Sequence, residues 1–348
     1  MEFLSEYGLF LAKTATLLIS IMIIVVFLIS VGQRTRRADH GHIEVRSLND
    51  NMENITRTLK HMVQHPDVFK QEQKQHKKTL KQTQKSEKVA SKTGGERRSR
   101  VYVVEFEGDI HASAVKHLRE EVTAILSVAE PIDEVVVKIE SPGGHVHGYG
   151  LAASQLRRIV DKEVPLTVSV DKVAASGGYM MACIANRIIA APFALLGSIG
   201  VIAQIPNFHR FLKNHDVDVE VLTAGEFKRT LTLFGENTDK GREKFLADLE
   251  DVHALFKEFV SENRPVVEID TVSTGEAWYG RRALDHKLID ELKTSDEYLY
   301  DKCEECDVYQ VRHIEDKNRL DRILDRTHTM LMRLTGRDKL EAPGPYIY

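Results

Sequence analysis

A serine in a run of small residues is the first candidate for chemistry in this sequence. Ser176 lies in A-A-S-G-G-Y (174–179), between a β-rich run at 166–170 and the helical M-M-A-C-I-A-N. A serine at the start of a helix lies in positive potential, and small neighbours leave its hydroxyl reachable. The N–H of Gly177 would then lie beside the oxygen that becomes negative when the serine attacks a carbonyl. The same pattern also fits a plain helix N-cap.

Lys228 is the candidate base. It lies in G-E-F-K-R-T (225–230), after an apolar run, V-E-V-L-T-A-G (219–225), that we expect to form a strand. A lysine accepts a proton only when it is neutral, and burial in an apolar pocket favours the neutral amine. One lysine alone is a weak signal, so a solvent-exposed Lys228 without a catalytic role is the alternative.

A glycine-rich turn follows the strand expected at 134–139. Its sequence is E-S-P-G-G (140–144). Glycine lets a substrate carbonyl approach free backbone N–H groups, and an oxyanion hole can be built from the main chain in this way. The turn therefore makes Gly143 a candidate donor, although a simple strand-to-helix connection explains the same residues.

Two histidines after this turn offer a rival mechanism. His145 and His147 could each pair with Ser176, because Ser–His–Asp triads occur in any chain order. No carboxylate is evidently placed in the sequence to orient either ring. A surface position at the start of a helix is the simpler interpretation.

Together these segments resemble the signal peptide peptidase A family, and within it the SohB-type inner-membrane proteases. The resemblance covers the chain from about Val101 to Glu291. It includes five blocks in the family's order: S-P-G-G (141–144), A-A-S-G-G-Y (174–179), G-S-I-G-V (197–201), G-x-x-K (225–228) and T-G-E-A-W-Y-G-R-R-A-L-D-H-K-L-I-D-E (274–291).

The resemblance implies a role for each matching residue. Ser176 would be the nucleophile, Lys228 the general base, and Ser198 a hydroxyl that orients the lysine amine. Gly143 and Gly177 would supply the N–H groups of the oxyanion hole. The resemblance implies no cofactor and no metal.

The resemblance also implies a fold and an assembly. The fold would be the ClpP/crotonase-like α/β spiral, and single-copy enzymes of this kind form closed rings whose sites are shared between neighbours. The family pattern usually continues S-P-G-G with another glycine, whereas His145 stands here. We therefore expect the local shape of this loop to differ.

The leading functional hypothesis is a serine endopeptidase that cuts peptides, such as signal-peptide remnants or unfolded membrane-associated segments. The apolar stretch at 199–205 suggests pockets for small or aliphatic side chains. One alternative is a crotonase-like acyl-transfer enzyme, because that fold also uses backbone oxyanion holes. Another is a catalytically silent membrane adaptor, against which the intact Ser176 and Lys228 argue.

The elements that must position these residues begin at Val101. Apolar β-rich runs alternate with helix-like stretches, which indicates a parallel α/β domain with helices on both faces. The expected strands are 101–106, 134–139 and 166–170, and the expected helices are 115–128, 151–160 and 239–263. A second apolar stretch, 188–205, contains Pro and Gly, so we expect buried strands and a tight turn, with a second membrane span as the alternative. We place the protease domain at 101–306, and an amphipathic helix (317–336) and tail in 307–348.

The first part of the chain has the pattern of a membrane anchor (1–37). Residues Thr14 to Val31 are eighteen uncharged residues, enough for a helix across a hydrocarbon core of about 30 Å. A signal-peptide cleavage site does not follow. We expect a single-pass anchor in the lipid of the bacterial inner membrane. Arginines at 34, 36 and 37 favour a cytoplasmic catalytic domain by the positive-inside rule, whereas the resembling family works outside the cytoplasm, so the side stays open.

Residues 38–100 read as a polar, basic tether with a short helical patch at 55–63. Between Lys70 and Arg100 there are eleven Lys or Arg against three Glu, within a chain of net charge −4. Aromatic residues do not interleave with these charges, so the run does not indicate a nucleic-acid partner. Cys303 and Cys306 form a C-x-x-C without the further ligands that a zinc site needs.

Overall fold

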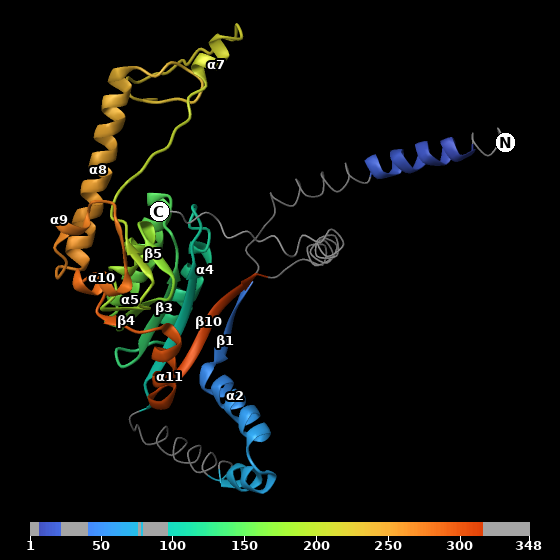
Figure 1. Ribbon diagram of the computed structural model, residues 1–348, viewed down its shortest axis with the longest axis vertical. Helices are drawn as coiled ribbons and strands as arrows, with labels where there is room; N and C mark the ends of the chain where they lie inside the picture. The colour runs from blue at the N-terminus through green and yellow to red at the C-terminus, as the bar shows by residue number, and fades with distance from the viewer. Residues whose placement is uncertain (1–6, 22–40, 76–77, 79–96, 316–348) are drawn as a thin grey trace. The chain divides into compact units, whose positions relative to one another are not determined.

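A mainly parallel sheet is the centre of the structure, a computed structural model that describes residues 7–21, 41–75, 78 and 97–315 (Figure 1). The strand order is β1-β10-β2-β3-β4-β6-β9, and each pairing from β10 to β9 is parallel. The strands are β1 (Gly41–Ser47), β2 (Arg100–Glu107), β3 (Glu134–Glu140), β4 (Leu166–Val170), β6 (Arg187–Ala190), β9 (Glu291–Leu292) and β10 (Asp307–Glu315). The α/β class expected from the sequence is confirmed.

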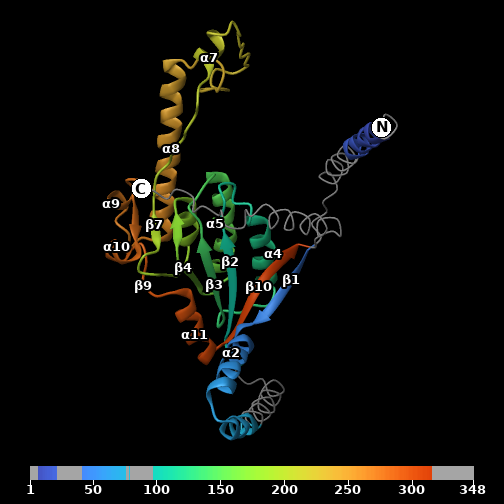
Figure 2. The ribbon, with the colours of Figure 1, turned by 45° about the vertical axis from the view of Figure 1, so that its right-hand side comes forward.

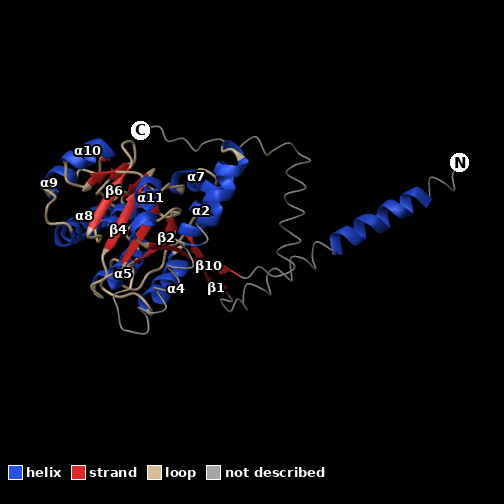
Figure 3. Cartoon of the chain, turned by 90° about the horizontal axis from the view of Figure 1, so that it is seen from below, coloured by secondary structure: helices blue, strands red, loops and turns tan. Residues whose placement is uncertain are grey.

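Helices cover both faces of this sheet, as Figure 3 shows. Alternate residues of β2 enter two different clusters: Val104 packs in the larger cluster and Val103 in the smaller one. The larger cluster includes residues of α4 (Val115–Leu126) and α5 (Val146–Val160), and the smaller includes residues of α11 (Ser295–Glu305). Strands buried on both faces explain the continuous apolar runs of the sequence.

A second, three-stranded sheet carries the turns that matter for chemistry. It consists of β5 (Val173–Ala175), β7 (Leu195–Gly197) and β8 (Ala277–Tyr279), with β5 parallel to β7 and β8 antiparallel to it. Short helices follow two of these strands: α6 (Gly177–Ala182) follows β5, and α10 (Gly280–Asp285) follows β8. In the apolar stretch 188–205, residues 188–200 form the expected strands and turn through β6 and β7, whereas residues 201–205 form no strand and are largely exposed.

Residues 201–238, which we call the arm, extend away from the sheets and return through the long helix α8 (Asp239–Asn263) (Figure 2). The arm contains the short helix α7 (His209–Lys213), and α8 is followed by α9 (Ile269–Val272). Much of the arm is apolar yet exposed, including Ile202 (91%) and Leu222 (88%). The strand expected at 219–225 does not form, because these residues pair with no other strand of the described chain.

The N-terminal predictions have mixed outcomes. Residues 7–21 are helical and belong to a different structural unit from residues 43–313. Within the described residues, no helix has the length and apolar character needed to cross a bilayer. The span expected from Thr14 to Val31 runs past residue 21, so its second half lies outside the described residues, as does the helix expected at 317–336.

The main sheet includes two strands, β1 and β10, that lie outside the domain expected at 101–306. The expected tether (38–100) includes β1 and the helix α2 (Leu48–Val63), which contains the predicted helical patch. The expected domain end at 306 lies just before β10, whose residues 307–310 pair with 100–103 of β2. Both β1 and β10 mix polar and apolar residues, so neither has the strong apolar signature of the central strands.

Candidate active site

The two predicted serines lie side by side at the end of the second sheet. Ala175 of β5 is paired with Gly197 of β7, so Ser176 and Ser198 leave neighbouring parallel strands at the same edge. The N–H of Ser176 donates a hydrogen bond of 2.7 Å to the carbonyl oxygen of Gly197. The sheet register thus brings together two serines that are 22 positions apart in the sequence.

Both serines have unusual backbone conformations. The φ angles of Ser176 and Ser198 are +50° and +52°, which is the left-handed side that non-glycine residues rarely occupy. At Ser176 the ψ angle is −116°, outside the ordinary left-handed helical region. Such strain costs about 1–3 kcal/mol and concentrates at functional sites. The strain at Ser176 therefore supports a role for the predicted nucleophile.

Glycines and one tyrosine fit closely around Ser176. A Cβ at Gly143, whose φ is +92°, would lie 2.7 Å from the Cβ of Ser176. A Cβ at Gly177 would lie 2.3 Å from Cγ of Tyr149. Only glycine fits at either position without movement of the backbone or of the buried Tyr149 ring. The predicted oxyanion-hole glycines thus lie around the predicted nucleophile.

The turn before α5 is held by a chain of hydroxyl groups. Tyr149 donates a 2.8 Å hydrogen bond to the carbonyl oxygen of Asp109, and its hydroxyl also contacts the Ser141 hydroxyl. The backbone N–H of Gly143 donates to Ser141 Oγ at 3.1 Å. Burial raises the pKa of Tyr149, so this hydroxyl stays protonated. The Gly143 N–H is therefore already engaged, whereas the Gly177 N–H begins α6 and has no acceptor within that helix.

A cavity of about 740 Å³ opens in front of Ser176. Ser198, Gly143 and Gly177 also line it, and the Oγ of Ser198 donates to the carbonyl oxygen of Gly275 at 3.3 Å. Most of the remaining wall is apolar, with contributions from Ile110, Val146, Met180, Ile202, Val252 and Phe256. A pocket of this size with apolar walls and a few convergent polar groups is typical of a ligand site.

A cluster of histidines lies at this cavity. His145 lines the cavity, its Nδ1 lies 3.3 Å from Nδ1 of His111, and its ring stacks on that of His147 with centroids 5.5 Å apart. Both predicted histidines are exposed. Among the described residues, no carboxylate is hydrogen-bonded to the ring of His145 or His147, which does not favour the Ser–His alternative. In the described part of the chain, no group of His, Cys, Asp or Glu is arranged to hold a metal ion.

Lys228 is exposed and does not line the cavity. Two residues next to Lys228 contact the first turn of α8. Glu226 forms an ion pair with Lys240, and Lys240 Nζ also lies 5.8 Å from the centroid of the Phe227 ring. The cavity contacts α8 at Val252, twelve residues further along. At 1.5 Å per residue, Lys240 lies about 18 Å along the helix from Val252. Within one chain the structure therefore does not bring Lys228 to Ser176.

Sequence reasoning missed Tyr149 and His253. The Tyr149 ring fills the space beside Gly177. In the sequence, the glycine at 177 is the one sign that a large side chain packs there. His253 of α8 lines the cavity, and its buried Nε2 has no hydrogen-bond partner. Its helix is remote in sequence from every motif, so no local pattern marks it.

Comparisons with known proteins identify the family of this chain. The N-terminal profile of peptidase family S49 matches residues 2–156, and the main profile of peptidase family S49 matches residues 158–308. The "Probable protease SohB" of Haemophilus influenzae is 50% identical over 316 residues, covering 90% of this chain and 89% of the relative. The "Probable protease SohB" of Buchnera aphidicola subsp. Schlechtendalia chinensis is 45% identical over 314 residues, covering 86% of this chain and 99% of the relative.

Among solved structures, the chain is similar to the 1510-N membrane-bound stomatin-specific protease in complex with a substrate peptide. The TM-score is 0.40 at 12% sequence identity, and the match covers 67% of this chain and 99% of the other.

Proposed function

Because this chain belongs to peptidase family S49, and is therefore a serine-type peptidase, we propose that Ser176 is its nucleophile and that Lys228 of a neighbouring subunit is its general base. The observation that carries the proposal is the strained backbone of Ser176, which faces the cavity beside two glycines that tolerate no side chain.

The surroundings of Ser176 suit attack on a peptide carbonyl. The N–H of Gly177 lies at the positive end of α6, next to the serine, where it can bind a developing oxyanion. Gly143 can join it when its hydrogen bond to Ser141 Oγ gives way to the stronger charged acceptor. Ser198, beside Ser176, is the proposed hydroxyl that orients the incoming lysine amine.

A second subunit supplies what one chain lacks. Lys228 lies on the arm, and the exposed apolar residues of the arm have no partner in the described chain that would cover them. Large exposed apolar surfaces typically mark protein–protein contacts. If the arm of one subunit covers the cavity of the next, burial there would favour the neutral lysine that a base requires. Such a head-to-tail contact gives a closed ring when its rotation closes, which is the assembly proposed here.

The proposed reaction has two halves. Ser176 Oγ attacks the substrate carbonyl carbon while Lys228 takes the hydroxyl proton and then delivers it to the leaving amine, which breaks the peptide bond and leaves an acyl ester on Ser176. Water then attacks the ester, giving a proton to Lys228. As the acid leaves, Lys228 returns this proton to Ser176 Oγ, which restores the serine hydroxyl, so no cofactor is consumed.

The apolar cavity walls favour peptides with small or aliphatic side chains near the cut. We propose signal-peptide remnants or unfolded membrane-associated segments as substrates, at the bacterial inner membrane to which residues 1–37 would anchor the chain. A ClpP/crotonase-like spiral is the proposed fold class, because a small second sheet here carries the site beside a parallel main sheet.

The decisive experiment mixes two inactive variants. Ser176→Ala and Lys228→Ala are each expected to abolish peptide hydrolysis. Co-expressed in equal amounts, they should form mixed rings in which roughly a quarter of the interfaces join an intact serine to an intact lysine. Activity should return to about that fraction, with Lys213→Ala on the same arm as a fully active control.

Two outcomes would count against the proposal. No activity from a verified mixed oligomer would mean that each site is built within one chain. Substantial activity of Lys228→Ala alone would mean that the base is misassigned. Labelling with a fluorophosphonate, expected for wild type and absent in Ser176→Ala, tests the nucleophile independently.

A further inference from the structure

Helix α2 carries an apolar stripe with a spacing of four and three residues. Leu48, Met52, Ile55, Leu59 and Met62 follow one another at intervals of 4, 3, 4 and 3. This is the a/d spacing of a coiled coil, narrower than the stripe of a helix that packs on a globular core. The spacing indicates a helix that pairs with another helix.

Most of this stripe is bare. Leu48 packs against the smaller core cluster, but further along the helix Ile55, Leu59 and Met62 are 62%, 64% and 79% exposed. Figure 1 shows α2 extending away from the sheet beyond the end of β1. We call Met52, Ile55, Leu59 and Met62 the α2 seam.

The helical residues that follow α2 pack on a different side of it. Lys60 Nζ lies 3.0 Å from Glu72, Gln64 Nε2 donates to Glu72 at 3.3 Å, and the rings of His61 and Phe69 are 5.0 Å apart. These contacts use residues outside the seam. The neighbouring segment therefore leaves the seam uncovered.

The charges of α2 also lie away from the seam. The positions that flank it are Asn49, Asn51, Thr56 and Thr58, none of which is charged. A helix that lies on a lipid surface carries basic residues beside its apolar face. Uncharged flanks instead let two identical helices approach without like-charge repulsion.

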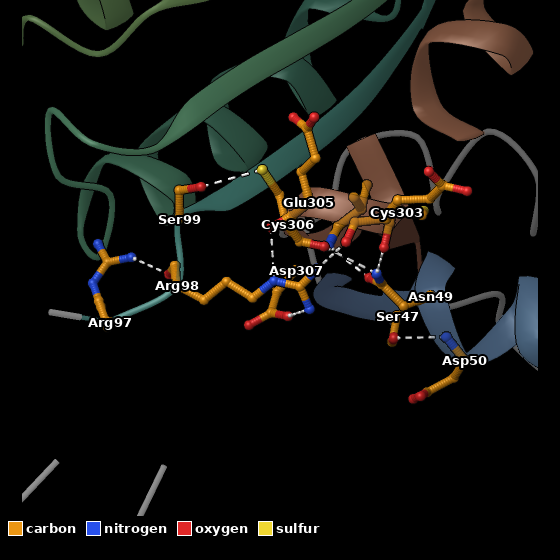
Figure 4. A network of polar contacts seen from close by, with 12 residues as sticks. Ser47, Asn49, Asp50, Arg97, Arg98, Ser99, Cys303, Glu305, Cys306 and Asp307 are labelled. Carbon is orange, nitrogen blue, oxygen red and sulfur yellow. Dashed lines mark hydrogen bonds and ion pairs between the residues drawn. The ribbon is translucent and has the colours of Figure 1, made fainter. Parts of the chain in front are cut away.

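The base of α2 is fixed to the body by polar contacts, which Figure 4 shows. Ser47 caps the helix by accepting from the N–H of Asp50, and Asn49 Nδ2 donates to the carbonyl oxygens of Cys303 and Cys306 at 2.9 and 3.0 Å. Asn49 Oδ1 accepts from the N–H of Val308 at 2.7 Å. Because the helix is already ordered by these contacts, it loses little conformational entropy when it pairs with another helix. A short helix is therefore sufficient for pairing.

We propose that the α2 seam pairs with the α2 seam of a second copy of this chain. The contact lies on an element separate from the cavity and the arm, and it does not depend on the assignment of Ser176 or Lys228. It would hold copies of the chain together through their N-terminal halves.

Cysteine cross-linking of the full chain in detergent tests the pairing. Ile55→Cys and Leu59→Cys, alone and mixed, are expected to give disulfide-linked dimers at least tenfold above Arg57→Cys, which places a thiol on the charged side of the same helix. Wild type measures the background from the native thiols, of which Cys303 is half-buried. Cys183 and Cys306 are buried, and burial raises the pKa of Cys183 to about 12.

A second variant measures the strength of the contact. Ile55→Ser combined with Leu59→Ser should raise the dissociation constant of the association at least tenfold in sedimentation experiments. Thermal unfolding of the dissociated chains should be unchanged because both side chains are exposed. Cross-linking no greater than that of Arg57→Cys would overturn the proposal. So would a Leu59→Cys thiol that couples to a photoactivatable lipid but to no second chain, because the face would then contact membrane.

Discussion

Gly143 and Ser176 approach so closely that the structure has room for only one side chain between them. A Cβ added to Gly143 would lie 2.7 Å from the Cβ of Ser176, 2.8 Å from the carbonyl oxygen of Ala175 and 2.9 Å from the N–H nitrogen of Gly177. The turn after β3 and the turn after β5 are therefore in direct contact, and the position of one depends on the other.

Gly143→Ala should inactivate the enzyme without unfolding it. The alanine would have to shift the Ser176 turn and would also adopt a φ of +92°, which glycine alone accepts without strain. We expect kcat/KM for a peptide substrate to fall at least about a hundredfold, because a misplacement of about 1 Å at a reacting group has this effect.

The matched control for this change is Gly150→Ala in α5, where an added Cβ meets no atom within 4 Å. It should keep full activity and unfold at the same or a higher temperature, since alanine is the better helix former. Equal kcat/KM for the two variants would show that the contact between Gly143 and Ser176 has no bearing on catalysis.

Ser198→Ala should lower activity in part. A hydroxyl that positions the lysine contributes through one hydrogen bond, so its loss should cost about 1–3 kcal/mol, or roughly fivefold to a hundredfold in kcat. The pH profile should change as well, because the orientation of the base is altered. Ser154→Ala, on the exposed side of α5, is the control. Wild-type rates at every pH would contradict this role.

Asp133 should make the fold sensitive to acid. Burial alone would raise the pKa of Asp133, but hydrogen bonds from Arg97 and from the N–H groups of Glu130 and Arg100 lower it overall. The stabilisation is therefore present above the unfolded-state pKa of about 3.9 and is lost as pH falls through the lower folded-state pKa.

Asp133→Asn should reduce the free energy of unfolding at pH 7 by about 2–3 kcal/mol, somewhat below the range for a fully buried pair because Arg97 is 26% exposed. Its stability should also depend less on pH below about 4. Asp161→Asn, which removes an exposed ion pair with Arg157, should change stability by less than about 1 kcal/mol. Chemical denaturation across a pH series measures both, and identical acid profiles for Asp133→Asn and wild type would exclude this contribution.

Local patterns predicted the interior of this fold well and its edges poorly. The helix at 239–263 has a strong helical period and is observed with those bounds. Strands 134–139 and 166–170 are apolar because both of their faces are buried, so sequence alone locates them. In contrast, β1 and β10 lie at one edge, mix polar with apolar residues, and depend on partners far away in the sequence.

The candidate site divides in the same way. The turns around Ser176 contain glycines, Gly143 and Gly177, at positions where the packing leaves no room for a side chain. Each of these turns can be recognised from a few adjacent residues in the sequence. No local motif predicts where Lys228 lies relative to Ser176, because Lys228 does not line the cavity at Ser176 within one chain. The apolar run at 219–225 predicts a strand, but in the described chain it pairs with no strand and its side chains are exposed.

The positive φ of Ser176 implies a trade-off between stability and activity at a single position. A glycine there would relieve about 1–3 kcal/mol of backbone strain, less about 0.5–1 kcal/mol for the greater freedom of the unfolded chain. Ser176→Gly should thus unfold at the same or a higher temperature than Ser176→Ala, although both lack the hydroxyl. Thermal robustness alone would favour glycine at this position, so a serine in the strained turn agrees with the proposed role of its hydroxyl.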